Sequence, residues 1–163
     1  MNIRIMGIVD DSIVDGPGLR LAVFTQGCPH HCPGCHNPQS HDFNGGKLMD
    51  TDEIIGKMDD DPLLDGITLT GGEPFAQPAA CAELARQAHA RGLNVWCYTG
   101  YTFEALLDDR EKRALLDQVD VLVDGRFELD KRSLELKFRG SSNQRIIDVK
   151  KSLGTDEVVW FPV

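Results

Sequence analysis

The chain has 163 residues, the length of a single domain, and its 41% hydrophobic and 26% charged residues are typical of a globular protein. With 26 acidic and 17 basic residues the net charge is −9, a field that opposes binding to nucleic acid and to anionic membranes. No apolar run reaches the roughly 20 residues that span a bilayer, and the N-terminus lacks a signal-peptide pattern. We therefore expect one cytoplasmic domain over residues 1–163.

Short apolar or β-branched runs alternate with helical segments along the chain. The first predicted strand, 19–25, leads into residues 26–50, which show neither helical nor strand periodicity and are predicted to form a long functional loop. Beyond it the sequence predicts helices at 51–58, 78–91 and 103–116, the last in one piece or two. It predicts strands at 67–70, 93–98, 119–123, 144–149 and 157–161.

Alternating strands and helices indicate an α/β fold with a parallel sheet and flanking helices. Polar or glycine residues follow three of the predicted strands, at Gly71-Gly72, Thr99-Gly100 and Asp124-Gly125. The carboxyl ends of parallel strands meet at one edge of the sheet, which is where such folds bind ligands. Since 26–50 also follows a strand, we expect all four segments to converge on one site.

Three of the five cysteines, Cys28, Cys32 and Cys35, lie close together in a C-x3-C-x2-C pattern, whereas Cys81 and Cys97 stand alone. An odd count with tight clustering is not a disulfide framework, and in a reducing compartment it favours a metal centre. One interpretation is a Cys3His zinc site, completed by a nearby histidine. The other is an iron–sulfur cluster with one iron left open, because a four-iron cluster normally takes four thiolates. The spacing alone leaves both open. The nearby histidines are His30, His31, His36 and His41.

Two motifs resemble those of radical S-adenosylmethionine (SAM) enzymes: the cysteine pattern, and Thr70-Gly71-Gly72-Glu73-Pro74 about 40 residues later. Four further segments are similar to the family of anaerobic ribonucleoside-triphosphate reductase activating proteins. The resemblance covers roughly residues 8–148, and 149–163 is interpreted as a C-terminal extension. It implies a partial, open β/α barrel of the radical SAM type. The four segments are Asp15–Arg20, Trp96–Tyr101, Val121–Phe127 and Arg139–Arg145.

The resemblance also implies an activity. Cys28, Cys32 and Cys35 would hold a [4Fe-4S] cluster, with SAM on the fourth iron. One electron, from a donor such as flavodoxin or ferredoxin, would cleave SAM to methionine and a 5′-deoxyadenosyl radical. That radical would take a hydrogen atom from a glycine of the partner, anaerobic ribonucleoside-triphosphate reductase, and leave a glycyl radical there.

Several residues fall at the family's SAM contacts. Gly34, Cys35 and His36 lie where the cysteine loop touches SAM, and Gly72 and Glu73 lie at the contact with the methionyl amino group. Glycine would let the backbone approach the ligand closely. His36 stands where the superfamily commonly has an aromatic residue, and its planar imidazole can stack in the same way.

Other candidates keep two interpretations. Asp124 either contacts SAM or steadies a basic partner group, or else it caps the following turn. Arg126 either anchors the SAM carboxylate or is a solvated charge. Cys81 and Cys97 are interpreted as small buried hydrophobic residues. Residues 139–145 form either a solvated loop or a segment near the active site or the partner interface.

Two other functions remain as alternatives. One is a small radical SAM enzyme that acts on a small molecule, like the carboxy-deazaguanine synthases. The other is a metal-stabilised binding module or electron carrier. Iron and sulfide analysis, followed by a test for SAM cleavage, separates the three.

Overall fold

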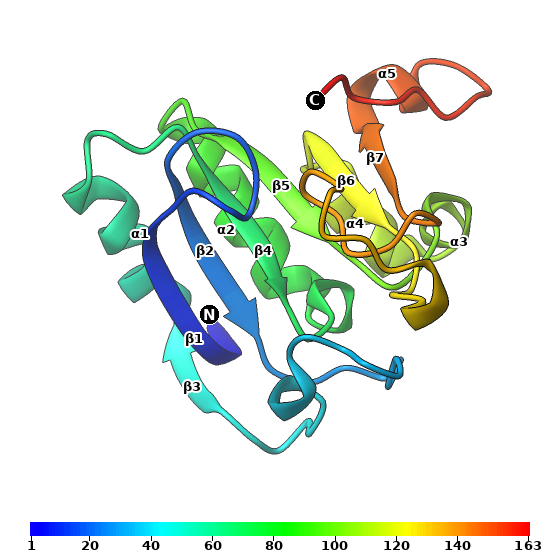
Figure 1. The fold of residues 1–163 in the computed structure, drawn as a ribbon. Coiled ribbons are helices and arrows are strands. Elements are labelled where there is room, and N and C mark those ends of the chain that lie inside the picture. Colours follow the sequence, from blue (N-terminus) through cyan, green and yellow to red (C-terminus); the bar gives the residue numbers. More distant parts are fainter.

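The computed structural model describes residues 1–163. Its centre is one mixed seven-stranded sheet with the strand order β3-β1-β2-β4-β5-β6-β7, flanked by helices (Figure 1). The strands are β1 (Asn2–Ser12), β2 (Arg20–Thr25), β3 (Lys47–Asp50), β4 (Gly66–Gly71), β5 (Asn94–Tyr98), β6 (Val121–Asp124) and β7 (Arg145–Asp148). The helices are α1 (Thr51–Asp60), α2 (Pro78–Ala90), α3 (Phe103–Leu107), α4 (Arg110–Leu116) and α5 (Val149–Leu153). None of them is both long enough and apolar enough to cross a membrane.

The predicted α/β sheet with flanking helices is confirmed, but the sheet is not wholly parallel. Strands β2, β4, β5 and β6 are parallel neighbours, whereas β1, β3 and β7 pair antiparallel at the two edges. Antiparallel neighbours need no helical crossover between them. Accordingly, the connections from β1 to β2 and from β6 to β7 contain no α-helix. The parallel centre therefore has its strand ends at one edge, as the site prediction requires.

The structure differs from the predicted strands at three places. β1 was not predicted, because two register shifts interrupt its pairing with β2 and Asp11 takes a positive φ of 55°. β3 occupies the last four residues of the 26–50 segment, where a short, mostly exposed edge strand leaves no clear alternation. Residues 157–161 do not form a strand, and only Trp160 pairs, in an isolated bridge to Ile147.

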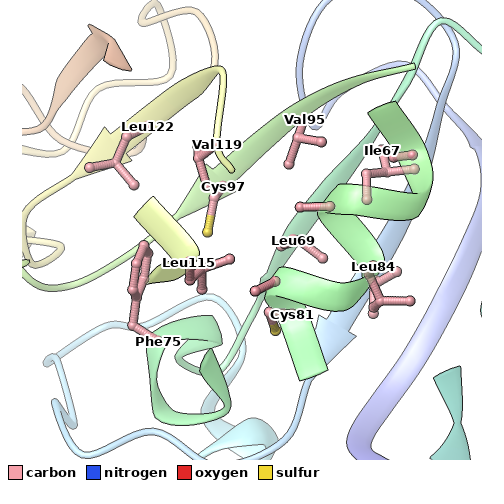
Figure 2. Close-up of a cluster of buried hydrophobic side chains, with 14 of the residues drawn as sticks. Ile67, Leu69, Phe75, Cys81, Leu84, Val95, Cys97, Leu115, Val119 and Leu122 are labelled. Carbon is pink, nitrogen blue, oxygen red and sulfur yellow. The ribbon is translucent and has the colours of Figure 1, made fainter. Parts of the chain in front are cut away.

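Helices α2 and α4 cover one face of the sheet with the main hydrophobic core (Figure 2). Ile67, Val95 and Leu122, on three neighbouring strands, are 0% exposed, and each such side chain contributes about 1.5–3 kcal/mol on burial. Cys81 and Cys97 lie in the same core, where burial raises the pKa of both thiols. They are thus small buried hydrophobic residues, as predicted.

Arg20 is fully buried beneath the connection between β1 and β2. Its guanidinium donates to the Thr68 hydroxyl at 2.8 Å, to the Ile67 carbonyl at 2.7 Å and to the Pro17 carbonyl at 3.0 Å. Burial lowers its pKa to about 10. These bonds fix the Asp15–Arg20 segment against β4.

The C-terminal residues fold back onto β7. Asp148 caps α5 by accepting from the Lys151 amide at 3.0 Å, and its own amide donates to the Val159 carbonyl at 2.8 Å. The Phe161 amide donates to Ile146, and the Phe161 ring meets Trp96 edge-on at 5.7 Å. Residues 149–163 therefore cover the outer edge of β7.

Candidate functional site

A cavity of about 650 Å³ opens at the carboxyl ends of the four parallel strands. Segments that follow all four strands line it, so the predicted convergence is confirmed. The lining includes Cys28, Cys32 and Cys35 after β2, Gly71 and Gly72 at the end of β4, Thr99 and Gly100 after β5, and Gly125 and Phe127 after β6.

The three clustered cysteines are free thiols that face this cavity from one loop. The loop is fixed by hydrogen bonds from the Gly27 amide to the Ser40 carbonyl at 2.6 Å and from the Cys28 amide to the His41 carbonyl at 3.2 Å. Burial raises the pKa of the Cys28 and Cys32 thiols. All three cysteines line the cavity of about 650 Å³, which has room for a group larger than one ion.

The donor set fits an iron–sulfur cluster better than a single zinc ion. No three His, Cys, Asp or Glu side chains converge closely enough to hold one metal ion. The sulfurs of a four-iron cluster's ligands bind separate irons, so they need no common point. The imidazole of His30, one of the candidate zinc ligands, is already engaged by a carboxylate.

That carboxylate belongs to Glu73, which is 0% exposed and does not line the cavity. It accepts from His30 Nε2 at 2.6 Å and from the Gly100 amide at 2.8 Å. It also accepts from the Phe75 amide at 3.0 Å and the Thr99 hydroxyl at 2.9 Å. Glu73 therefore ties the cysteine loop, the segment after β4 and the segment after β5 together.

His30 is a site residue that sequence reasoning considered only as a zinc ligand. Its side chain is 4% exposed, and its ring packs edge-on against Tyr101 with centroids 4.6 Å apart. The only sequence signal was its position between Cys28 and Cys32. Its partner Glu73 lies 43 residues away, so the pairing depends on the fold.

Gly72 lines the cavity, where glycine would let a ligand approach the backbone closely. The structure gives a second reason for glycine at this position. A Cβ atom there would lie 2.5 Å from the Gly27 carbonyl oxygen and 3.1 Å from that of Ser40. The Gly72 amide also donates to Thr25 at 2.9 Å. Close backbone packing against the cysteine loop therefore requires glycine at this position, independently of any ligand.

The other predicted residues divide between the cavity and its surroundings. His36 lines the cavity, and its ring lies 5.1 Å from that of Phe127. Gly34 is not among the lining residues; it has a φ of +73°, and a Cβ atom there would meet the side chain of Leu129.

Asp124 is 1% exposed and lies outside the cavity lining. Its carboxylate accepts from Arg145 at 2.6 and 3.0 Å and from the Phe103 amide at 2.8 Å. These contacts hold the basic group of Arg145 and join β6 to β7 and to the start of α3. Its contact with SAM stays a prediction.

The connection between β6 and β7 supplies a wall of the cavity that the sequence indicated only in part. Arg139, Gly140 and Gln144 line it, as do Leu134 and Phe138. Arg139 is held by the carbonyls of Ser142 and Gln144 and lies over the Trp160 ring. Residues 139–145 are thus a braced turn beside the cavity rather than a solvated loop.

Comparison with known proteins agrees with this site. A family model described as a 4Fe-4S single cluster domain matches residues 14–147. The crystal structure of QueE from Escherichia coli shares the fold, with a TM-score of 0.53 and 15% identity over 76% of this chain and 70% of that one. The molecule is therefore an α/β protein of the [4Fe-4S] single-cluster class.

Three relatives define the family further. The anaerobic ribonucleoside-triphosphate reductase-activating protein of Escherichia coli K12 is 37% identical over 142 residues, which cover 81% of this chain and 90% of the relative. The protein of the same name from Pasteurella multocida is 39% identical, and the match covers 82% of this chain and 90% of the relative. The one from Enterobacteria phage T4 is 34% identical, and the match covers 82% of this chain and 86% of the relative. The chain belongs to the family of anaerobic ribonucleoside-triphosphate reductase-activating proteins, which confirms the resemblance and the [4Fe-4S] cofactor.

Proposed function

We propose that this chain is a radical SAM enzyme that forms a glycyl radical on anaerobic ribonucleoside-triphosphate reductase. The observation that carries the proposal is the meeting of the three cysteines and the Gly71-Gly72 segment in one cavity at the strand ends. When bound and reduced, the cluster supplies the electron that cleaves SAM to methionine and a 5′-deoxyadenosyl radical. The protein's part is to hold both groups and to admit the reacting glycine.

Cys28, Cys32 and Cys35 are the proposed cluster ligands. Their loop is clamped by the Gly27 and Cys28 backbone bonds and by the pair of His30 and Glu73. With only three thiolates facing the cavity, one iron is left for SAM. No further cysteine can take that position, because Cys81 and Cys97 lie in the core.

SAM is proposed to lie along the cavity wall with Gly72 at its methionyl amino group and His36 beside its adenine. Gly34 and Cys35 contribute the turn of the cysteine loop. Glu73 contributes by fixing this backbone, since its carboxylate already accepts from four groups. Asp124 would act in the same way through Arg145.

The architecture that we propose is a partial, open β/α barrel, with the cavity at the mouth formed by β2, β4, β5 and β6. The sheet does not close on itself: β3 forms one edge, and β7, covered by the C-terminal residues, lies at the other (Figure 1). A short chain of this kind leaves the cavity open to a protein substrate, which would complete the enclosure.

A low-potential donor such as flavodoxin or ferredoxin, and a cytoplasmic location, are parts of the same proposal. Five free cysteines are typical of a protein in a reducing compartment. A cluster with an open iron needs such a compartment.

Electron paramagnetic resonance tests the proposed function. We expect a glycyl doublet in the reductase after anaerobic incubation with the reconstituted protein, SAM and a reductant. SAM cleavage without that doublet, when the reductase is supplied, would favour the small-molecule alternative. An intact cluster that cannot cleave SAM would favour an electron carrier.

A further inference from the structure

The connection between β6 and β7 contains a hairpin, residues 131–142, that projects at the cavity. Arg132 pairs with Ser141 in an antiparallel bridge, and the Ser142 amide donates to the Lys131 carbonyl at 3.0 Å. The Phe138 ring meets Trp96 edge-on at 5.4 Å. The bridge closes the base of the hairpin, and the Phe138 contact holds one side of its tip, residues 133–139, against the sheet.

The tip presents apolar side chains at the cavity. Leu134 is 94% exposed and lines the cavity together with Leu136. Val14, from the connection between β1 and β2, lines the same cavity and is 73% exposed, and its neighbour Ile13 is 71% exposed. A single exposed leucine is ordinary, but exposed apolar residues that gather at a cavity are typical of a binding surface.

The hairpin region is also basic in an acidic chain. Residues 126–145 hold six basic and three acidic residues, although acidic residues predominate in the whole sequence. Arg132 and Lys137 are exposed and form no ion pair, and Lys131 pairs only with Glu128, at 3.3 Å on the surface. A positive surface of this kind, with two charges unpaired and one in an exposed pair, attracts an acidic partner and raises its rate of association.

We infer that the 131–142 hairpin is a docking surface for an acidic segment of the reductase with apolar side chains, next to the reacting glycine. This inference rests on the proposed function, because the glycine must reach a cavity of which the hairpin forms one wall. Leu134 would contact the apolar side chains of that segment, and Lys131 and Lys137 its carboxylates.

Charge reversal tests the electrostatic part. We expect the double variant Lys131→Glu/Lys137→Glu to bind the reductase about tenfold more weakly and with a smaller dependence on salt. The matched control is Lys47→Glu/Lys151→Glu, which makes the same charge change at two exposed lysines outside the hairpin, on β3 and α5. This control should stay within about twofold of wild type.

A leucine pair tests the apolar part. Leu134→Ser should weaken binding about fivefold, as expected for an apolar side chain buried at an interface. Leu63→Ser is its control, because Leu63 is 74% exposed and follows α1, outside the cavity lining. Equal affinities for the two leucine variants would contradict a contact at Leu134.

SAM cleavage without the reductase separates docking from damage to the site. Neither Lys131 nor Lys137 lines the cavity, so their double variant should cleave SAM at the wild-type rate. If wild type activates the reductase and the hairpin variants bind it as tightly, only the docking inference fails. Variants that change self-association but not reductase affinity would also overturn it. A wild-type protein that neither binds nor activates the reductase overturns both proposals.

Discussion

Glu73 illustrates how one buried carboxylate can organise a site without lining it. Its oxygens accept from a histidine in the cysteine loop and from two backbone amides and a hydroxyl after β4 and β5. Removing one donor from a buried carboxylate costs about 1.5–3 kcal/mol. The pair of His30 and Glu73 is therefore expected to hold the cysteine loop in place.

His30→Ala should lower the free energy of unfolding by about 1.5–3 kcal/mol and reduce the iron bound after anaerobic reconstitution. Urea unfolding of the apoprotein and iron analysis measure the two effects. His30→Gln, which keeps an amide donor, should restore part of the iron.

His89→Ala is the matched control for this prediction. His89 Nε2 lies 2.8 Å from the Asp120 carboxylate, and neither residue lines the cavity. The iron content of the His89→Ala protein should equal that of wild type. Equal iron losses in the two alanine variants would contradict a specific role for His30.

Gly72→Ala is expected to reduce cluster content as well as SAM binding. The new methyl group would lie 2.5 Å from the Gly27 carbonyl oxygen, and only movement of the cysteine loop relieves that contact. Iron and sulfide analysis together with SAM titration measure both effects.

Gly56→Ala provides the comparison, because Gly56 lies in α1 with open space where its Cβ would be. It should raise stability by up to about 1 kcal/mol without changing cluster content. A Gly72→Ala protein with a full cluster and weakened SAM binding would show that the ligand alone requires glycine here.

At the scale of elements, local signals predicted the centre of the sheet well. β2, β4 and β5 are short apolar runs, and α1 begins after the capping carboxylate of Asp50. Elements that depend on distant contacts were missed or misassigned. β1 is interrupted by register shifts, and Val159 to Phe161 have β-branched and aromatic composition but lie along β7 without forming a regular strand.

The site divides in the same way. The three cysteines could be found from their spacing, and Gly72 from the resemblance of residues 70–74 to a known motif, because both signals lie in contiguous segments. The partners of Glu73 and the ion pair between Asp124 and Arg145 could not, since the fold brings these residues together across 43 and 21 positions.

The C-terminal segment yields a prediction at this scale. Phe161→Ala should lower the free energy of unfolding by about 1–2 kcal/mol, because the half-buried ring packs on Trp96 beside β7. Val163→Ala, at a position 57% exposed, should change stability by less than about 0.5 kcal/mol. Equal free energies of unfolding for the two variants, measured with urea, would mean that the C-terminal segment does not stabilise the sheet.

For the whole molecule, the arrangement of strands explains both the site and its openness. The parallel centre brings four loops to one cavity, and the antiparallel edges leave the sheet unclosed. The cysteine loop, the Gly71-Gly72 segment proposed to hold SAM and the 131–142 hairpin then lie around one opening. This arrangement suits an enzyme whose substrate is part of another protein.

The most direct test of this account is SAM cleavage by single cysteine variants, measured as 5′-deoxyadenosine released under anaerobic, reducing conditions. Cys28→Ala, Cys32→Ala and Cys35→Ala should each abolish cleavage, because every ligand of a three-thiolate cluster is needed. Cys81→Ala and Cys97→Ala should retain it, since both side chains are 0% exposed in the core. Full cleavage by any of the first three variants would contradict the assignment of the cluster to this loop.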